Sequence, residues 1–145
     1  DAPLSGRGQP RRARPSGGKP GAVYAALDLG TNNCRLLIAE PAGADGFRVV
    51  DSFSRIVRLG EGLEANGALS EAACGRAIAA LKICAGKVRA QGAGRLRGVA
   101  TEACRRARNG RDFLRRVAAE TGLALEPISA EEEARCVIVA VFDTG

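Results

Sequence analysis

The sequence predicts an α/β domain in which three antiparallel strands precede alternating helices and strands. Short apolar runs separated by turn-forming residues occupy residues 22–53, and beyond residue 70 the apolar residues recur at helical spacing. The chain has 145 residues, of which 46% are hydrophobic and only 3% aromatic. This length supports one domain, with a core built from small and aliphatic side chains.

Three segments are expected to form the antiparallel part of the sheet. Residues 23–27 are apolar throughout and suit a buried strand, and residues 28–33 follow as a cluster of turn formers. Residues 36–39 predict a second strand and residues 47–53 a third, separated by a glycine turn. Short turns between consecutive strands indicate an antiparallel meander.

Helices and strands then alternate. Ser70 is the expected N-cap of a helix of about five turns that ends before Gly92. Residues 96–101 predict the fourth strand, Asn109 is the expected N-cap of a second helix ending at Gly122, and residues 123–128 predict the fifth strand. A capping box formed by Ser129 and Glu132 predicts a last helix through about residue 140. This is the ribonuclease-H-like order that actin-like phosphotransferases share.

The positive charge is concentrated at the start of the chain. The formal net charge is +6, and residues 1–20 hold five basic residues against Asp1, a net of +4. These residues also hold four of the six prolines. We therefore expect residues 1–20 to be a disordered basic leader and residues 21–145 to be the folded domain. The leader is either a passive solvated tail or a contact for polyanions.

The composition excludes several kinds of site. The chain contains no histidine, which excludes Ser-His-Asp and Cys-His catalysis and leaves proton transfer to carboxylates, Lys, Tyr, Cys or water. Its five cysteines are scattered and odd in number, which favours reduced thiols. No secretion signal or membrane span is visible. We expect a cytoplasmic protein.

The turn after the first strand suits phosphate. Asp28 ends the apolar run, Gly30 lets the backbone approach a ligand, and the polar residues Thr31, Asn32 and Asn33 follow. The same residues also suit an ordinary hairpin turn. Both interpretations stay open on this segment alone.

Several segments together resemble the exopolyphosphatase and guanosine pentaphosphate phosphohydrolase (Ppx/GppA) family. The matching segments occur in family order and span about residues 23–135. They are ALDLGTN at 26–32, VRLGEGL at 57–63, GALS at 67–70, VATEACRRARN at 99–109 and ISAEEEAR at 128–135.

The resemblance implies an actin-like fold of two domains facing a cleft, of which this chain would be the first. It implies hydrolysis of the terminal phosphate of inorganic polyphosphate, guanosine pentaphosphate or both, with Mg²⁺. Carried over by motif, Asp28 to Asn33 form the first phosphate loop, with Asp28 facing the metal directly or through water. Arg105 binds a substrate phosphate, and Glu133 is the base that activates water. It also allows a homodimer of the full-length protein, and no membrane or specific nucleic-acid partner is expected.

Structural roles compete for two of these residues. Arg105 lies in an arginine-rich stretch whose members suit solvated helix positions. Glu133 lies in the first turn of a predicted helix, where the helix dipole favours acids whatever their function.

Two further functions remain as alternatives. One is a fragment of an actin-like sugar kinase or ATPase, which shares the Asp28–Thr31 turn pattern. The other is a non-catalytic polyanion-binding module that uses the leader and the arginines, although few aromatic residues are present for base stacking. Because the chain begins at Asp1 and stops at Gly145 behind an apolar run, we expect a fragment with little or no activity alone. Residues 143–145 would then be either the start of a second phosphate loop or the end of a truncated helix.

Overall fold

A mixed five-stranded sheet forms the centre of the domain. The computed structural model describes residues 22–44 and 46–135. In it the strands lie in the order β3-β2-β1-β4-β5, with β1 antiparallel to β2, β2 antiparallel to β3, and β4 parallel to both β1 and β5. This confirms the predicted α/β class and its ribonuclease-H-like order. The strands are β1 (Tyr24–Leu29), β2 (Asn33–Pro41), β3 (Phe47–Ile56), β4 (Arg95–Ala100) and β5 (Leu125–Pro127).

The first hairpin is tighter than the sequence predicts. Asp28 lies within β1, opposite Arg35, and Asn33 is the first residue of β2. Strand pairing extends this far because Leu29 and its partner Cys34 are both buried in the core. The turn itself, called here the β1–β2 turn, therefore consists of residues 30–32 only.

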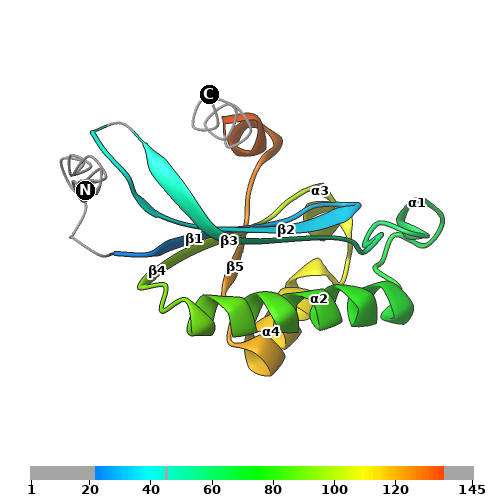
Figure 1. Cartoon of the computed structure of the whole chain (residues 1–145). Helices are drawn as coiled ribbons and strands as arrows, with labels where there is room; N and C mark the ends of the chain where they lie inside the picture. Colours follow the sequence, from blue (N-terminus) through cyan, green and yellow to red (C-terminus); the bar gives the residue numbers. More distant parts are fainter. Residues whose placement is uncertain (1–21, 45, 136–145) are drawn as a thin grey trace, which may run out of the picture.

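The two long helices that the sequence predicts are present, and both cover the same face of the sheet (Figure 1). They are α2 (Glu71–Ala90) and α4 (Gly110–Thr121). Ser70 caps α2, since its hydroxyl accepts a hydrogen bond from the backbone N–H of Ala73 at 3.1 Å. Gly122 ends α4 in the left-handed conformation, as expected.

Two short helices were not expected. They are α1 (Leu63–Asn66) and α3 (Glu102–Arg106), of four and five residues. Helices this short show no apolar periodicity, so the sequence carries no pattern for them. Gly62 and Gly67 flank α1, both with positive φ.

Asn109 is the N-cap residue of α4, as predicted, but its side chain does not cap the helix. The side chain bonds instead to Leu69, forty residues earlier. The Asn109 Oδ1 accepts from the Leu69 N–H at 2.8 Å, and its Nδ2 donates to the Leu69 carbonyl at 3.0 Å. Both the oxygen and the nitrogen of the Asn109 side-chain amide are thus hydrogen-bonded, whereas a side-chain cap of the helix would use only the oxygen.

The core lies between the sheet and the covering helices. Ala73, Ala77 and Ala80 of α2 are fully buried, and their small side chains bring the helix close to the strands. The expectation of a core built from small and aliphatic residues is confirmed for the described residues. The four described cysteines, at positions 34, 74, 84 and 104, are buried and free, and Cys136 lies outside the described residues.

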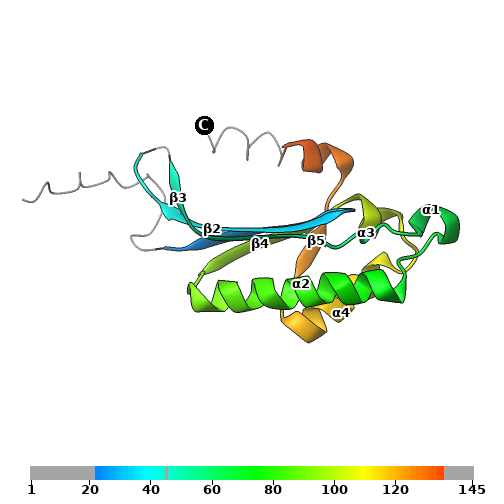
Figure 2. The same cartoon turned by 45° about the vertical axis from the view of Figure 1, so that its right-hand side comes forward.

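The chain crosses to the opposite face after β5. Residues 130–135 are helical and lie on the side of the sheet away from α2 and α4 in both views (Figures 1 and 2). Ser129 accepts a hydrogen bond from the backbone N–H of Glu132 at 3.1 Å, as the predicted cap requires. The predicted continuation of this helix to residue 140 lies outside the described residues, as do the basic leader and residues 143–145.

Within the described ranges, no helix is long and apolar enough to cross a lipid bilayer.

Candidate active site

The candidate site lies at the carboxyl ends of three parallel strands, β1, β4 and β5. Thr101, which follows β4, donates its backbone N–H to the Leu29 carbonyl at 3.0 Å, and its buried hydroxyl bonds the same oxygen at 3.3 Å. Ile128, which follows β5, donates its N–H to the Ala100 carbonyl at 3.0 Å. These bonds bring three chain segments together at one edge of the sheet, where α/β proteins commonly bind ligands.

The β1–β2 turn presents free backbone donors at this edge. The Gly30 N–H bonds the Asn33 carbonyl at 2.9 Å, whereas the N–H groups of Thr31 and Asn32 have no acceptor among the described residues. The carbonyls of Thr31 and Asn32 accept hydrogen bonds from the chain after β3. Because the carbonyls are occupied and the N–H groups are free, the turn can bind an anion.

Arg105 of α3 is held beside the end of β5. Its Nη1 donates to the Ile128 carbonyl at 2.6 Å and lies 3.4 Å from Glu133 Oε2. Within the described part of the chain, its Nε and Nη2 have no protein acceptor. Two of its three guanidinium nitrogens are therefore free to bind phosphate oxygens.

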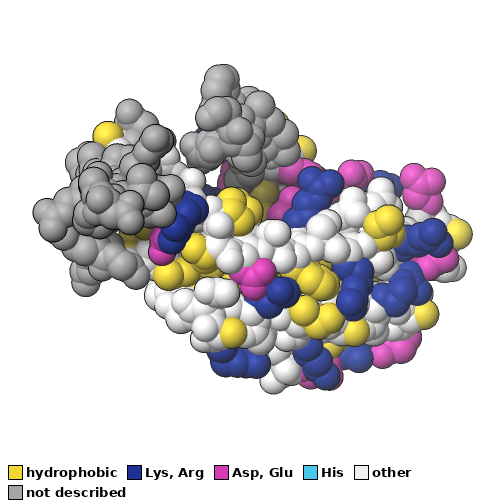
Figure 3. All heavy atoms as spheres, in the orientation of Figure 1, with side chains coloured by type: hydrophobic (Ala, Val, Ile, Leu, Met, Phe, Trp, Pro, Cys, Tyr) yellow, Lys and Arg dark blue, Asp and Glu magenta, His cyan; other side chains and the backbone are white. Residues whose placement is uncertain are grey.

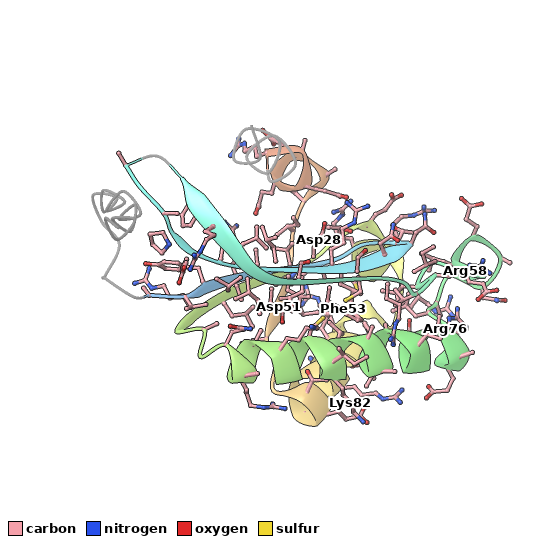
Figure 4. The ribbon with its side chains drawn as sticks, in the orientation of Figure 1. Asp28, Asp51, Phe53, Arg58, Arg76 and Lys82 are labelled. Atoms are coloured by element: carbon pink, nitrogen blue, oxygen red, sulfur yellow. The ribbon has the colours of Figure 1, made fainter. Side chains whose placement is uncertain are left out.

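Glu133 and Asp28 lie on the same side of the sheet although 105 positions separate them. Asp28 is on the sheet face opposite α2 (Figure 4), the same side as the helix that carries Glu133. Desolvation and then the nearby Glu133 carboxylate raise the pKa of Asp28 above its ordinary value of 3.8, while Arg35 acts to lower it. The structure thus brings the predicted residues Asp28, Arg105 and Glu133 together.

Arg35, which no sequence motif indicated, belongs to the same cluster. It is the cross-strand partner of Asp28 and the nearest basic influence on its carboxyl. Hairpin register is the signal that could have found it, because a turn at residues 30–32 places residues 28 and 35 opposite each other. Asn33, which was predicted to belong to the phosphate loop, lies instead in β2.

The carboxylates of this cluster fit a divalent cation. Asp28 and Glu133 carry like charges, and Glu133 is the second cause, after desolvation, of the raised pKa of Asp28, so a nearby cation would offset both effects. The described residues contain no cluster of three or more metal-binding side chains. One or two carboxylates completed by substrate phosphates and water are a common arrangement for Mg²⁺, and Asp28 provides one such carboxylate.

We predict that Asp28→Asn stabilises the ligand-free chain at pH 7. Because the folded state raises the pKa of Asp28, it binds the proton more tightly than the unfolded state, so ionisation costs stability as the pH rises above 3.8. Although desolvation is the largest cause of the shift, Asp28 remains exposed, so solvent screens its charge and the gain should stay below about 1 kcal/mol. Urea unfolding of the parent chain and the variant, in the presence of a chelator at pH 7 and at pH 3, measures this gain in stability. The gain should vanish at pH 3, and a gain of equal size at both pH values would contradict this explanation.

Most of the neighbouring arginines are used in surface ion pairs. Arg106 pairs with Glu102, Arg115 with Asp112, and Arg116 with Glu71 and Glu120, all at 2.8–3.1 Å. Acidic and basic side chains accordingly alternate on the visible surface (Figure 3). The interpretation as solvated helix charges therefore suits these three arginines, while Arg105 differs from them by reaching the strand edge.

The strand order and the helices after it define an α/β domain of the ribonuclease-H-like class. A model of the Ppx/GppA phosphatase family matches residues 37–145. The chain therefore belongs to the Ppx/GppA phosphatase family.

Solved structures agree with this assignment. A Ppx/GppA family member from Aquifex aeolicus is 34% identical, with a TM-score of 0.77 over 83% of this chain and 39% of that chain. An exopolyphosphatase from Cytophaga hutchinsonii is 26% identical, with a TM-score of 0.73 over 78% of this chain and 36% of that chain. The chain thus spans less than two fifths of the length of either protein.

Proposed function

We propose that this chain supplies one wall of a phosphoanhydride hydrolase site that releases the terminal phosphate of inorganic polyphosphate, guanosine pentaphosphate or both. The observation that carries the proposal is the meeting of Asp28, Arg105 and Glu133 beside a turn with free N–H donors. A guanidinium, free N–H groups and carboxylates at one point suit a terminal phosphate and an attacking water.

Each residue has a separate role in this proposal. The N–H groups of Thr31 and Asn32 and the free nitrogens of Arg105 bind the oxygens of the terminal phosphate and fix its orientation. Glu133 accepts a proton from the water as its oxygen bonds to phosphorus and the bridging P–O bond breaks. The shortened chain leaves as an anion. A carboxylate takes this role because the chain has no histidine.

Asp28 would hold Mg²⁺, directly or through water, which leaves Glu133 free to accept the proton. The cation would offset negative charge on the phosphate oxygens. Arg35, opposite Asp28, adds a fixed positive charge on the same face of the sheet.

Family membership favours a hydrolase over a sugar kinase, and the name of the Cytophaga relative points to polyphosphate as a substrate. The second wall of the cleft would come from outside this chain, as the coverage of the solved relatives suggests. We therefore expect the 145-residue chain alone to bind substrate weakly and turn it over slowly or not at all.

Phosphate release tests the proposal. Tripolyphosphate, long-chain polyphosphate and guanosine pentaphosphate are each incubated with Mg²⁺ and with the protein expressed from the whole reading frame that contains this chain. The 145-residue chain is measured in parallel. Release of inorganic phosphate from at least one substrate, lost on chelation, is expected. No release from any of the three, or phosphate transfer from ATP to a sugar, would contradict the proposal.

A further inference from the structure

We propose that Arg76 is a positioning residue for the β1–β2 turn, acting through residues 57–61, which we call the bracing segment. This inference rests on the proposed function of the turn as a phosphate site. Arg76 lies on α2, and Figure 4 shows it at the same end of the molecule as Arg58 of the bracing segment.

The bracing segment binds the turn through three backbone hydrogen bonds. The N–H groups of Val57 and Arg58 both donate to the Asn32 carbonyl, at 2.8 and 3.0 Å, and the Gly60 N–H donates to the Thr31 carbonyl at 3.0 Å. These bonds orient the two peptide groups so that their carbonyls face the segment. The Thr31 carbonyl and the Asn32 N–H belong to the same planar peptide group, so the bond from Gly60 fixes the direction of the free Asn32 N–H for an anion.

The segment also approaches the turn very closely. A Cβ atom at Gly60 would overlap the Thr31 side-chain methyl group. A larger residue at position 60 would force the Thr31 side chain to rotate or one of the two segments to move. The position of the bracing segment therefore decides the position of Thr31.

This position requires backbone strain. Arg58 has a φ of 49°, and it is the only non-glycine residue with positive φ in the described ranges. Such a conformation is unfavourable for a residue with a Cβ atom and persists only where surrounding contacts enforce it.

Arg76 supplies those contacts. Its Nε donates to the Val57 carbonyl at 2.9 Å and its Nη2 donates to the Arg58 carbonyl at 3.2 Å, while Nη2 also pairs with Glu61. One planar guanidinium thus holds both peptide groups beside the strained residue. Lysine could not replace it, because an ammonium group cannot present two donors in this fixed geometry.

Without Arg76, the strained segment would relax and its bonds to the carbonyls of Thr31 and Asn32 would weaken. The turn would then sample orientations in which a carbonyl, rather than an N–H, faces the phosphate. Arg76 therefore affects phosphate binding without needing to touch the phosphate.

Two substitutions at Arg76 and one matched control test this role in the 145-residue chain. Arg76→Gln removes the charge and both carbonyl contacts, whereas Arg76→Lys keeps the charge. The control is Arg116→Gln. Arg116 is also a helical arginine, and it pairs with the two carboxylates of Glu71 and Glu120. Its side chain is 40% exposed, against 39% for Arg76, and it contacts neither the turn nor the bracing segment. Amide spectra confirm folding of each variant.

The first measurement needs no ligand. We expect both Arg76 variants to show faster hydrogen exchange at the N–H groups of Val57, Arg58 and Gly60 and shifted amide resonances at Thr31 and Asn32. Arg116→Gln should leave all five unchanged. The second measurement is calorimetric binding of inorganic tripolyphosphate in Mg²⁺ buffer, where both Arg76 variants should bind about tenfold more weakly than the parent chain.

The inference is wrong if exchange and turn resonances are unchanged in the Arg76 variants, or if Arg116→Gln changes them equally. It is also wrong if Arg76→Lys binds tripolyphosphate as the parent does, since charge alone would then explain the role of Arg76. If the parent chain itself does not bind tripolyphosphate, the proposed function fails, and the ligand-free measurement still decides whether Arg76 orients the turn.

Discussion

Replacing Glu133 with glutamine is expected to lower the rate of phosphate release about 10²–10⁴-fold, the range typical for loss of a general base. Glutamine keeps the size of the side chain and a contact to Arg105, but it cannot accept a proton from water at neutral pH. The loss should fall on kcat, with little change in KM, because the phosphate would be bound by the turn and by Arg105. The assay uses the protein that carries this chain in its whole reading frame.

The matched control for this substitution is Glu131→Gln. Glu131 lies two residues away in the same helical segment, but its side chain is 80% exposed and pairs with Arg135 at 3.1 Å. We expect its loss to change the rate by less than about twofold, as for most surface substitutions. Equal losses in the two variants, or an unchanged rate with Glu133→Gln, would mean that Glu133 is not the base.

Replacing Gly110 with alanine is expected to lower the free energy of unfolding by about 2–4 kcal/mol, the largest loss of stability among the substitutions proposed for this chain. Gly110 is buried at the start of α4, where the chain turns back on α3. A Cβ atom here would overlap the carbonyl oxygen of Cys104 and lie 2.9 Å from its carbonyl carbon. Both atoms are backbone, so α3 and α4 would have to separate.

Urea unfolding measures this loss, and Gly75→Ala is the control. Gly75 lies in the exposed interior of α2, and a Cβ atom there would meet nothing within 4 Å. Alanine at this position should stabilise the chain by about 0.5–1 kcal/mol, because it favours the helix. If Gly110→Ala unfolds at the same urea concentration as the parent chain, the close packing of α3 against α4 is wrong.

The fold could be predicted from the sequence where an element is long enough to show its period. The repeated apolar positions of α2 and its Ser70 cap are local patterns, and so are the turns between the first three strands. The short helices α1 and α3 have no such pattern. Their long-range contacts form only when the chain has folded, such as the hydrogen bonds from Arg108 to the Asn66 carbonyl of α1 and from Arg105 of α3 to the Ile128 carbonyl.

The site could be predicted in part. The family resemblance implied a role for each of Asp28, Arg105 and Glu133 separately. The sequence alone does not show that Arg105 lies 3.4 Å from Glu133 in the folded chain. Arg76 was not predicted because its two main acceptors are backbone carbonyls, 18 and 19 positions away, which every residue possesses. Hydrogen bonds from a side chain to a distant backbone carbonyl cannot be recognised from residue type or spacing.

The central claim is that the β1–β2 turn, Arg105 and Glu133 form one phosphate site, and a titration of the ¹⁵N-labelled chain with tripolyphosphate and Mg²⁺ tests it most directly. The amide resonances of Gly30, Thr31 and Asn32, the Nε–H of Arg105 and the amide of Glu133 should shift together, along one binding curve. Shifts confined to the basic leader or to residues 111–116, or separate curves for the turn and for Arg105, would contradict the claim.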